Sequence, residues 1–428
     1  MPAPSNKRSR EAARPSTDNT DLQHARQQPA APEAGPVPVT GPATQVIRVS
    51  SPVSLLAAIP VVLKFVPAEP SIVVLGVTPP RSEVAVTVRY HIDRPNSAAA
   101  LARHAAGILA AQGITTAHAV GYGSGEMVTP VADALRARFA EAGITVAEFL
   151  RVQDGRYWSY VCADPRCCPP EGTPYDLEAH PVTRKYAHLV LASREDLAAT
   201  LAPVTGEAAK SMGKATRAAL QRARRLAAGA GGGRARRWPL LEPGLKAVTD
   251  AIDLYRGGGK LESHKDAARL ALALRDLPVR DDAWARMLPE HRKAHLRLWT
   301  DLTILAQGRY AAAPASLLAF CAWQDGDGAL ANVALDRAQA ADPSYSMAEL
   351  IREALDCGAP PSMARPPMTP EEVAAAYACT EEPDEAEGQE ETTSDSGNGE
   401  PADGETSGGT AAGDSTATRS QPPAGVRA

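Results

Sequence analysis

Hydrophobic positions in the first part of the chain switch between the period of a strand and that of a helix. Residues 71–77 (SIVVLGV) form a continuous apolar run of strand length, which is typical of a strand buried on both faces. Residues 83–92 alternate between apolar and polar positions and predict a second strand. Residues 98–112 are rich in alanine and precede Gly113, so they predict a helix.

The alternation of strands and helices continues along the chain. Residues 116–122 predict a third core strand, and Thr129-Pro130 predicts the start of an amphipathic helix that ends at Gly143. Residues 144–152 predict the next strand. Strands separated by helices indicate an α/β domain with a mixed, mostly parallel sheet.

A hairpin and an unusual loop follow the last of these strands. Asp154-Gly155 is a strong turn signal because both residues tolerate positive φ, so residues 156–162 are predicted to return as an antiparallel strand at the sheet edge. The segment DGRYWSYVCADPRCCPPEGTPYD (154–176) then becomes too rich in proline for regular structure. We take this segment as the feature around which the chain is organised.

Three kinds of chemistry are open to the cysteines of this segment, which are Cys162, Cys167 and Cys168. They could be packed thiols or form a local disulfide, in which vicinal Cys167 and Cys168 pair poorly with each other but either could meet Cys162. They could sense redox state, because Arg166 lies beside Cys167 and favours a thiolate. They could bind zinc, although the Cys-x4-Cys-Cys spacing lacks a second Cys-x2-Cys pair.

A glycine-rich turn is the other candidate binding site. Gly121, Gly123 and Gly125 follow a predicted strand and precede a helix, which is where nucleotides and S-adenosylmethionine are bound, and Glu148 on the next strand could contact a ribose. The spacing is G-x-G-x-G rather than G-x-G-x-x-G, so a plain turn is favoured. No complete catalytic motif occurs, and the sequence assigns neither a catalytic residue nor a cofactor.

The second half of the chain predicts helices only. Residues 194–227 form a helical segment whose second half is basic, and residues 229–233 are glycine-rich and predict a flexible joint. Nucleic-acid binding by this segment is disfavoured, because no aromatic side chain interleaves the charges before Trp238 and no recognition motif is present. Residues 312–343 have the small and large apolar spacing of a single tetratricopeptide-type helical hairpin.

Composition limits the class of protein. The chain has 428 residues, a net charge of −5 and six cysteines, which is not a disulfide framework. The longest apolar run, residues 53–66, is interrupted by Pro60 and Lys64 and is too short to span a bilayer. Without an apolar stretch after the basic N-terminal residues, no signal peptide is expected. We therefore expect a cytoplasmic protein that does not bind membranes.

The expected organisation has two folded domains between disordered tails. The predicted parts are a disordered tail (1–44), an α/β domain with the cysteine-rich loop (45–193), a basic helical segment with a glycine-rich linker (194–240), an all-α domain (241–380) and an acidic disordered tail (381–428).

The chain resembles an actinobacterial family catalogued as domain of unknown function 4192. The similarity is carried by SPVSLLAAIPVVLKFVPAEPSIVVLGV (51–77), by the segment 154–176, and by LLAFCAWQDGDGALANVALDRAQAADPSYSMAELIREALDCGAPP (317–361). It covers roughly residues 45–365 and implies no activity, ligand or partner. We expect a non-enzymatic interaction or regulatory module with a protein partner on the helical domain. The alternative is a ligand-binding, redox or metal-dependent enzyme that uses the glycine and cysteine loops.

Overall fold

A computed structural model describes residues 47, 49–78, 83–229, 238 and 240–378. The two predicted tails, 1–44 and 381–428, lie outside the described residues. Within the linker, the glycines after Gly229 also lie outside them.

The first part of the chain forms one six-stranded mixed sheet. Its strands are β1 (Ser71–Thr78), β2 (Glu83–His91), β3 (Thr116–Tyr122), β4 (Thr145–Gln153), β5 (Arg156–Ser159) and β6 (Thr173–Pro174). Their order in the sheet is β2-β1-β3-β4-β5-β6. A mixed sheet with an antiparallel hairpin at its edge is therefore confirmed.

The expectation of a mostly parallel sheet is wrong. Only β3 and β4 pair in parallel, whereas β1 pairs antiparallel with both β2 and β3, and β4, β5 and β6 pair antiparallel in turn. The connection from β1 to β2 is too short for the crossover that parallel strands need. The apolar run in β1 was misleading, because helices cover both faces of this antiparallel strand and bury it as fully as a parallel one.

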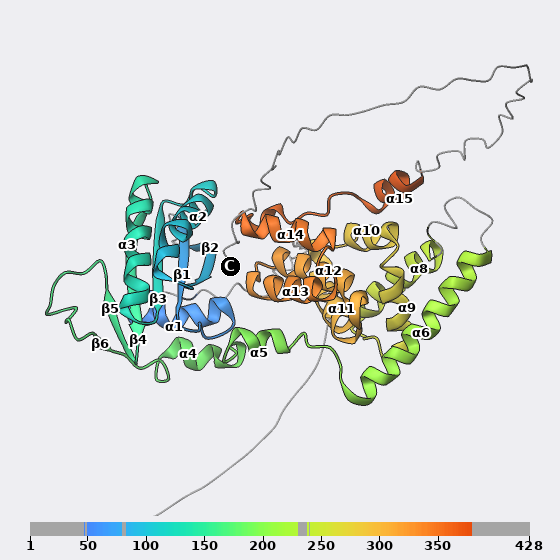
Figure 1. The fold of residues 1–428 in the computed structure, drawn as a ribbon, viewed down its shortest axis with the longest axis horizontal. Helices are drawn as coiled ribbons and strands as arrows, with labels where there is room; N and C mark the ends of the chain where they lie inside the picture. Colours follow the sequence, from blue (N-terminus) through green and yellow to red (C-terminus); the bar gives the residue numbers. More distant parts are fainter. Residues whose placement is uncertain (1–46, 48, 79–82, 230–237, 239, 379–428) are drawn as a thin grey trace, which may run out of the picture. The chain divides into compact units, whose positions relative to one another are not determined.

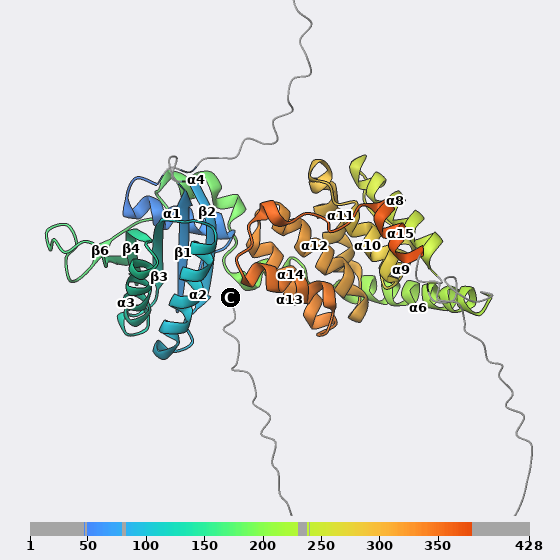
Figure 2. The ribbon, with the colours of Figure 1, turned by 90° about the horizontal axis from the view of Figure 1, so that it is seen from above.

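Helices cover the sheet on both faces. Figures 1 and 2 show α2 (Ala98–Ala111) and α3 (Gly125–Glu141) on one face and α1 (Pro52–Leu63) on the other. The core under α2 and α3 contains Leu101, Leu109, Val131, Leu135, Phe139 and, from the strands, Ile72, Val74 and Phe149. The core under α1 contains Leu55, Leu56, Ile59 and, from the strands, Val73, Val120 and Leu150. The helices thus each bury one apolar side, whereas the central strand β1 contributes side chains to the cores on both faces.

The rest of the described chain is helical, and from Arg194 onward this agrees with the prediction. Its α-helices are α4 (Pro181–Tyr186), α5 (Arg194–Ala199), α6 (Gly206–Gly229), α8 (Leu241–Arg256), α9 (His264–Ala273), α10 (Leu277–Ala285), α11 (Arg292–Leu305), α12 (Ala312–Gln324), α13 (Gly328–Ala341), α14 (Ser346–Asp356) and α15 (Pro370–Ala378). Short 3₁₀ turns are η1 (Pro95–Ser97), η2 (Ala187–Leu189), η3 (Pro289–His291), η4 (Gly308–Ala311) and η5 (Pro361–Met363). Of the described helices, none combines the length and apolar character that crossing a membrane requires.

The predicted helical hairpin near the end of the chain consists of α12 and α13. Gly326 turns the chain with a φ of 75°, and the Asp327 carboxylate caps α13 by accepting a hydrogen bond from the backbone N–H of Leu330 at 3.0 Å. Small residues such as Ala319 and Ala331 are fully buried. The helices are confirmed, while their likeness to a tetratricopeptide repeat stays a prediction.

Burial of His295 on α11 should make the protein less stable at mildly acidic pH. The ring is almost fully buried and stacks on Trp299, and burial lowers its pKa to about 4. The unfolded chain takes up this proton below its ordinary pKa of about 6.5, so stability falls as the pH drops from there towards 4. We expect a loss of about 2 kcal/mol between pH 7 and pH 5 in urea denaturation. A His295→Gln variant should lack this contribution, and an unchanged pH dependence would refute the assignment.

Candidate functional site

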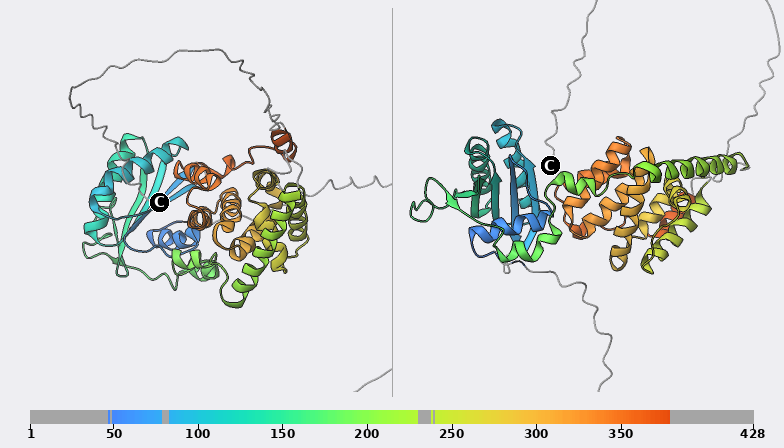
Figure 3. Two further views of the ribbon diagram at one scale, coloured as in Figure 1. Left: turned by 45° about the vertical axis from the view of Figure 1, so that its right-hand side comes forward. Right: turned by 90° about the horizontal axis from the view of Figure 1, so that it is seen from below.

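The cysteine-bearing loop is suspended from a tight hairpin between β4 and β5. Asp154 and Gly155 both have positive φ, 48° and 71°, as a two-residue hairpin turn with the twist of the strands requires. This confirms the hairpin predicted from the sequence. The strand after the turn is shorter than expected, since β5 ends at Ser159 and not at Cys162. The chain then leaves the sheet and returns as β6, so the loop extends from the β5–β6 edge (Figures 1 and 3).

Trp158 anchors both ends of the loop to the sheet. The guanidinium of Arg151, on the neighbouring β4, lies 3.6 Å from the centre of the indole ring. On the far side of the loop, the indole N–H donates a hydrogen bond of 2.9 Å to the carbonyl of Pro170. Gly172 packs directly on the ring, where a Cβ atom would come within 2.5 Å of Trp158 Cε2. The loop is therefore clamped at its return, close to where it leaves the sheet.

Replacing Gly172 by alanine should loosen this clamp. Its φ of 81° already disfavours a side chain, and the added methyl group would collide with Trp158. Gly155 is a matched control, because its φ of 71° is similar but no atom lies within 4 Å of the position of its Cβ. In urea denaturation we expect Gly172→Ala to cost about 1 kcal/mol more than Gly155→Ala. Equal losses of stability in the two variants would mean that the positive φ alone, and not contact with Trp158, requires glycine at position 172.

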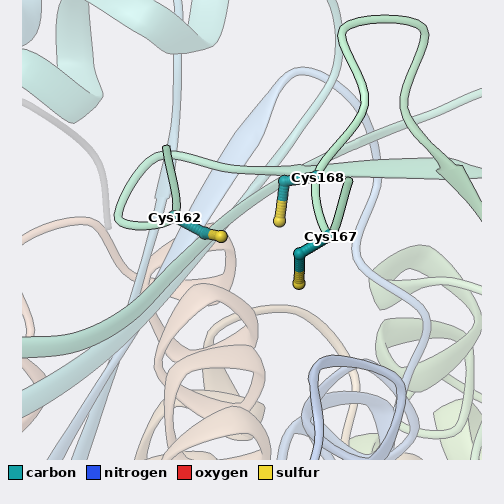
Figure 4. Close-up of side chains that lie close together, drawn as sticks. All are labelled: Cys162, Cys167 and Cys168. Atoms are coloured by element: carbon teal, nitrogen blue, oxygen red, sulfur yellow. The ribbon is translucent and has the colours of Figure 1, made fainter. Parts of the chain in front are cut away.

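The loop brings the three cysteines together. The sulfur atoms of Cys162, Cys167 and Cys168 all lie within 4.8 Å of one another. Figure 4 shows Cys167 and Cys168 side by side, with the Cys162 side chain directed towards them. Cys167 is exposed and the other two are half-buried. We call this group the thiol cluster.

A turn at Asp164 creates the thiol cluster. The Asp164 carbonyl accepts hydrogen bonds from the backbone N–H groups of Cys167 and Cys168, at 3.1 and 2.7 Å. Its carboxylate accepts one from the backbone N–H of Arg166 at 2.9 Å and pairs with the guanidinium of that residue. At the other end, the hydroxyl of Ser159 accepts the backbone N–H of Cys162 at 3.1 Å. These local bonds fold the two later cysteines back onto the first.

The environment shifts the pKa values of two of these thiols in opposite directions. The backbone N–H of Asp164 lowers the pKa of Cys162, and the neighbouring Cys168 thiol acts in the same direction. Burial raises the pKa of Cys168, and the two other thiols raise it further. Contact with Arg166 lowers the pKa of the Asp164 carboxyl. The environment therefore favours the thiolate form at Cys162 and the neutral thiol at Cys168.

The glycine turn has a packing role in the structure. Helix α3 begins at Gly125, so the predicted start at Pro130 is wrong and the proline lies inside the helix. A Cβ atom on Gly121 would lie 2.2 Å from Val128 Cγ1, so α3 packs against β3 only because this residue is glycine. Gly123 has a φ of 128° and contacts Pro70. Packing and turn geometry thus account for Gly121 and Gly123.

Glu148 is not brought to the glycine turn. It lies in the middle of β4 opposite His118, where its carboxylate accepts hydrogen bonds of 2.9 Å from the Ser159 hydroxyl and the backbone N–H of Phe149. Side chains alternate along the strand, so Glu148 faces away from the side of the sheet that α2 and α3 cover, where Phe149 is buried. The predicted cofactor group therefore does not converge, whereas the predicted cysteine group does.

The sequence did not reveal the residues that hold the loop. Arg151, Trp158, Gly172 and Asp164 make the contacts described above, but none belongs to a known motif. Of these four, Trp158 is the one aromatic residue, in a chain in which aromatic residues make up 4%. Its partners could not be paired in advance, because the contacts depend on the strand register and on where the loop returns.

Comparison with known proteins adds one match. The model of a family described as a domain of unknown function matches residues 52–362. This match covers nearly the whole span over which the sequence resembles that family. No curated protein and no solved structure matches the chain.

Proposed function

We propose a function for this chain, which belongs to the family of domain of unknown function 4192, from the thiol cluster. The chain is a zinc-binding regulatory or interaction protein, in which the metal is held by Cys162, Cys167 and Cys168. The bound metal fixes the loop at the β5–β6 edge into a recognition surface. The helical part offers a second surface to a protein partner.

The distance between the sulfurs carries this proposal. Zinc bound at about 2.3 Å by thiolates in tetrahedral geometry holds its sulfurs about 3.8 Å apart. In the structure the three sulfurs lie within 4.8 Å of one another. Small side-chain rotations would therefore complete the site. A bound Zn²⁺ would also favour the thiolate form of Cys168, whose pKa is otherwise raised.

The fourth coordination position supports a regulatory role. No histidine or carboxylate from the described part of the chain joins the three thiols within the same distance. The remaining ligand would then be a water molecule or a side chain from a partner. No cysteine lines either of the two cavities of about 480 and 580 Å³ in the described chain, and Cys167 is exposed, so the metal would lie on the loop outside both cavities. Exposure favours recognition over catalysis.

A disulfide is the competing use of the same thiols. A disulfide would join two of the three cysteines and leave the third as a free thiol, whereas a metal ion would be bound by all three. In the cytoplasm, where we place the chain, thiols are kept reduced. Metal binding also explains why two adjacent cysteines, which pair poorly with each other, both face Cys162.

Zinc titration of the reduced protein against a chromophoric chelator tests the proposal. We expect one zinc per chain, and Cys168→Ser should weaken binding by about 100-fold or more. Cys357→Ser is the matched control, because Cys357 is also an exposed free thiol but lies outside the cluster. Equal affinities in both variants would contradict the proposal. Absence of zinc binding together with the loss of two thiols on oxidation would favour the disulfide.

A further inference from the structure

A cavity of about 480 Å³ lies away from the thiol cluster. Strand β2 forms one wall, and the end of α1 and the outer side of α2 form others. Its apolar lining includes Val62, Phe65, Val86, Val88, Trp323 and Leu355. This volume lies in the range of small-molecule pockets, and the apolar lining suits the body of such a ligand.

Arg89 is the unusual residue of this cavity. Its side chain is half-buried and packs near Phe65, with the guanidinium carbon 5.7 Å from the ring centre. Its Nε is buried without a hydrogen-bond partner, and its side chain forms no ion pair with any residue of the described chain. A buried cation normally faces a carboxylate, since an unpaired charge is costly to remove from water.

A second guanidinium, that of Arg194, adds to the positive charge around Arg89. Burial lowers the pKa of Arg89, and the nearby guanidinium of Arg194 lowers it further, against a weaker opposite effect of Glu195. Arg194 lines the same cavity and pairs with Asp336 at 2.6 Å. Asp356, an acidic residue of the lining, instead interacts with Arg352 and His104. Within the described part of the chain, Arg89 therefore has no ion pair, and the nearby Glu195 offsets its charge only in part.

We propose that the cavity binds a small organic anion whose carboxylate or phosphate head pairs with Arg89. The planar guanidinium presents a fork of N–H donors that matches either head. The apolar walls receive an aliphatic body of the ligand. A bound anion would supply the negative charge that no residue of the described chain brings into an ion pair with Arg89. In a structural ion pair, a carboxylate of the protein would supply that charge.

Calorimetric titration of the full chain with octanoate, octyl phosphate and neutral 1-octanol tests this inference. We expect at least one of the two anions to bind with one site, and 1-octanol to bind at least tenfold more weakly. Arg89→Met should weaken binding of the anion by about 10- to 100-fold. Arg103→Met is the control, since Arg103 is exposed on α2 and does not line the cavity. The stronger of the two anions identifies the head group.

Thermal melting without ligand separates a binding role from a structural one. Arg89→Met should melt at the same temperature as the parent or higher, because it removes a half-buried charge that has no ion pair in the described chain. A clear drop in melting temperature would show that Arg89 stabilises the fold. That drop, equal anion affinity in Arg89→Met and the parent, or no binding of either anion by the parent would each overturn the inference.

Discussion

Gly121→Ala should destabilise the protein by about 3 kcal/mol. The new Cβ atom would lie 2.2 Å from Val128 Cγ1, well inside van der Waals contact. Val128 is fully buried on α3 and is β-branched, so it has little freedom to move away. Inserting a methyl group into a packed core forces strain of this size. Urea denaturation of the variant and the parent measures the loss.

Two further variants make this prediction specific. In a Val128→Ala background, the additional cost of Gly121→Ala should fall to less than about 0.5 kcal/mol, because the obstructing methyl groups are gone. Gly107→Ala on α2 should instead stabilise by about 0.5–1 kcal/mol, since nothing lies within 4 Å of the position of its Cβ. A full cost of Gly121→Ala in the Val128→Ala background would mean that the glycine serves something other than packing.

Removal of zinc should cost about 3 kcal/mol of stability. A metal that binds only the folded state stabilises it by about 2.7 kcal/mol when free metal is 100 times its dissociation constant. The three ligands lie in one loop, so the effect should appear as a lower melting temperature after chelation and return when zinc is added back. Differential scanning calorimetry of reduced protein, with and without a chelator, measures it.

Cysteine variants decide whether that effect belongs to the thiol cluster. Cys162→Ser should melt like the chelated parent and should no longer respond to the chelator. Cys357→Ser, with its changed residue at the end of α14, should respond as the parent does. A chelator response that persists in Cys162→Ser would place the metal elsewhere in the chain.

Local signals predicted the hairpin that carries the site. Asp154 and Gly155 adopt the positive φ that their side chains tolerate, and the strands on either side follow from alternation. The cysteine-rich loop was also identified from the sequence, because its prolines exclude regular structure. The turn and the irregular loop are determined by residues that are close together in the sequence, so they can be predicted from it.

The convergence of the thiols and the strand directions depended on contacts that the sequence does not show. Cys162 meets Cys168 because the turn at Asp164 closes and Trp158 clamps the returning chain at Pro170. In the sheet, burial of β1 on both faces is compatible with parallel or antiparallel neighbours, so the apolar run does not show which strands pair or in which direction. The start of α3 differs from the prediction because Pro130 is typical of a first helical residue, whereas it lies inside this helix, where it removes one backbone hydrogen bond.

X-ray absorption at the zinc edge tests the central claim most directly. For the reduced full-length protein loaded with one equivalent of zinc, we predict three sulfur neighbours at about 2.3 Å and one lighter neighbour at about 2.0 Å. In Cys168→Ser one sulfur should be lost from this shell. A spectrum with only oxygen and nitrogen neighbours, or one that Cys168→Ser leaves unchanged, would contradict the assignment of the thiol cluster as the metal site.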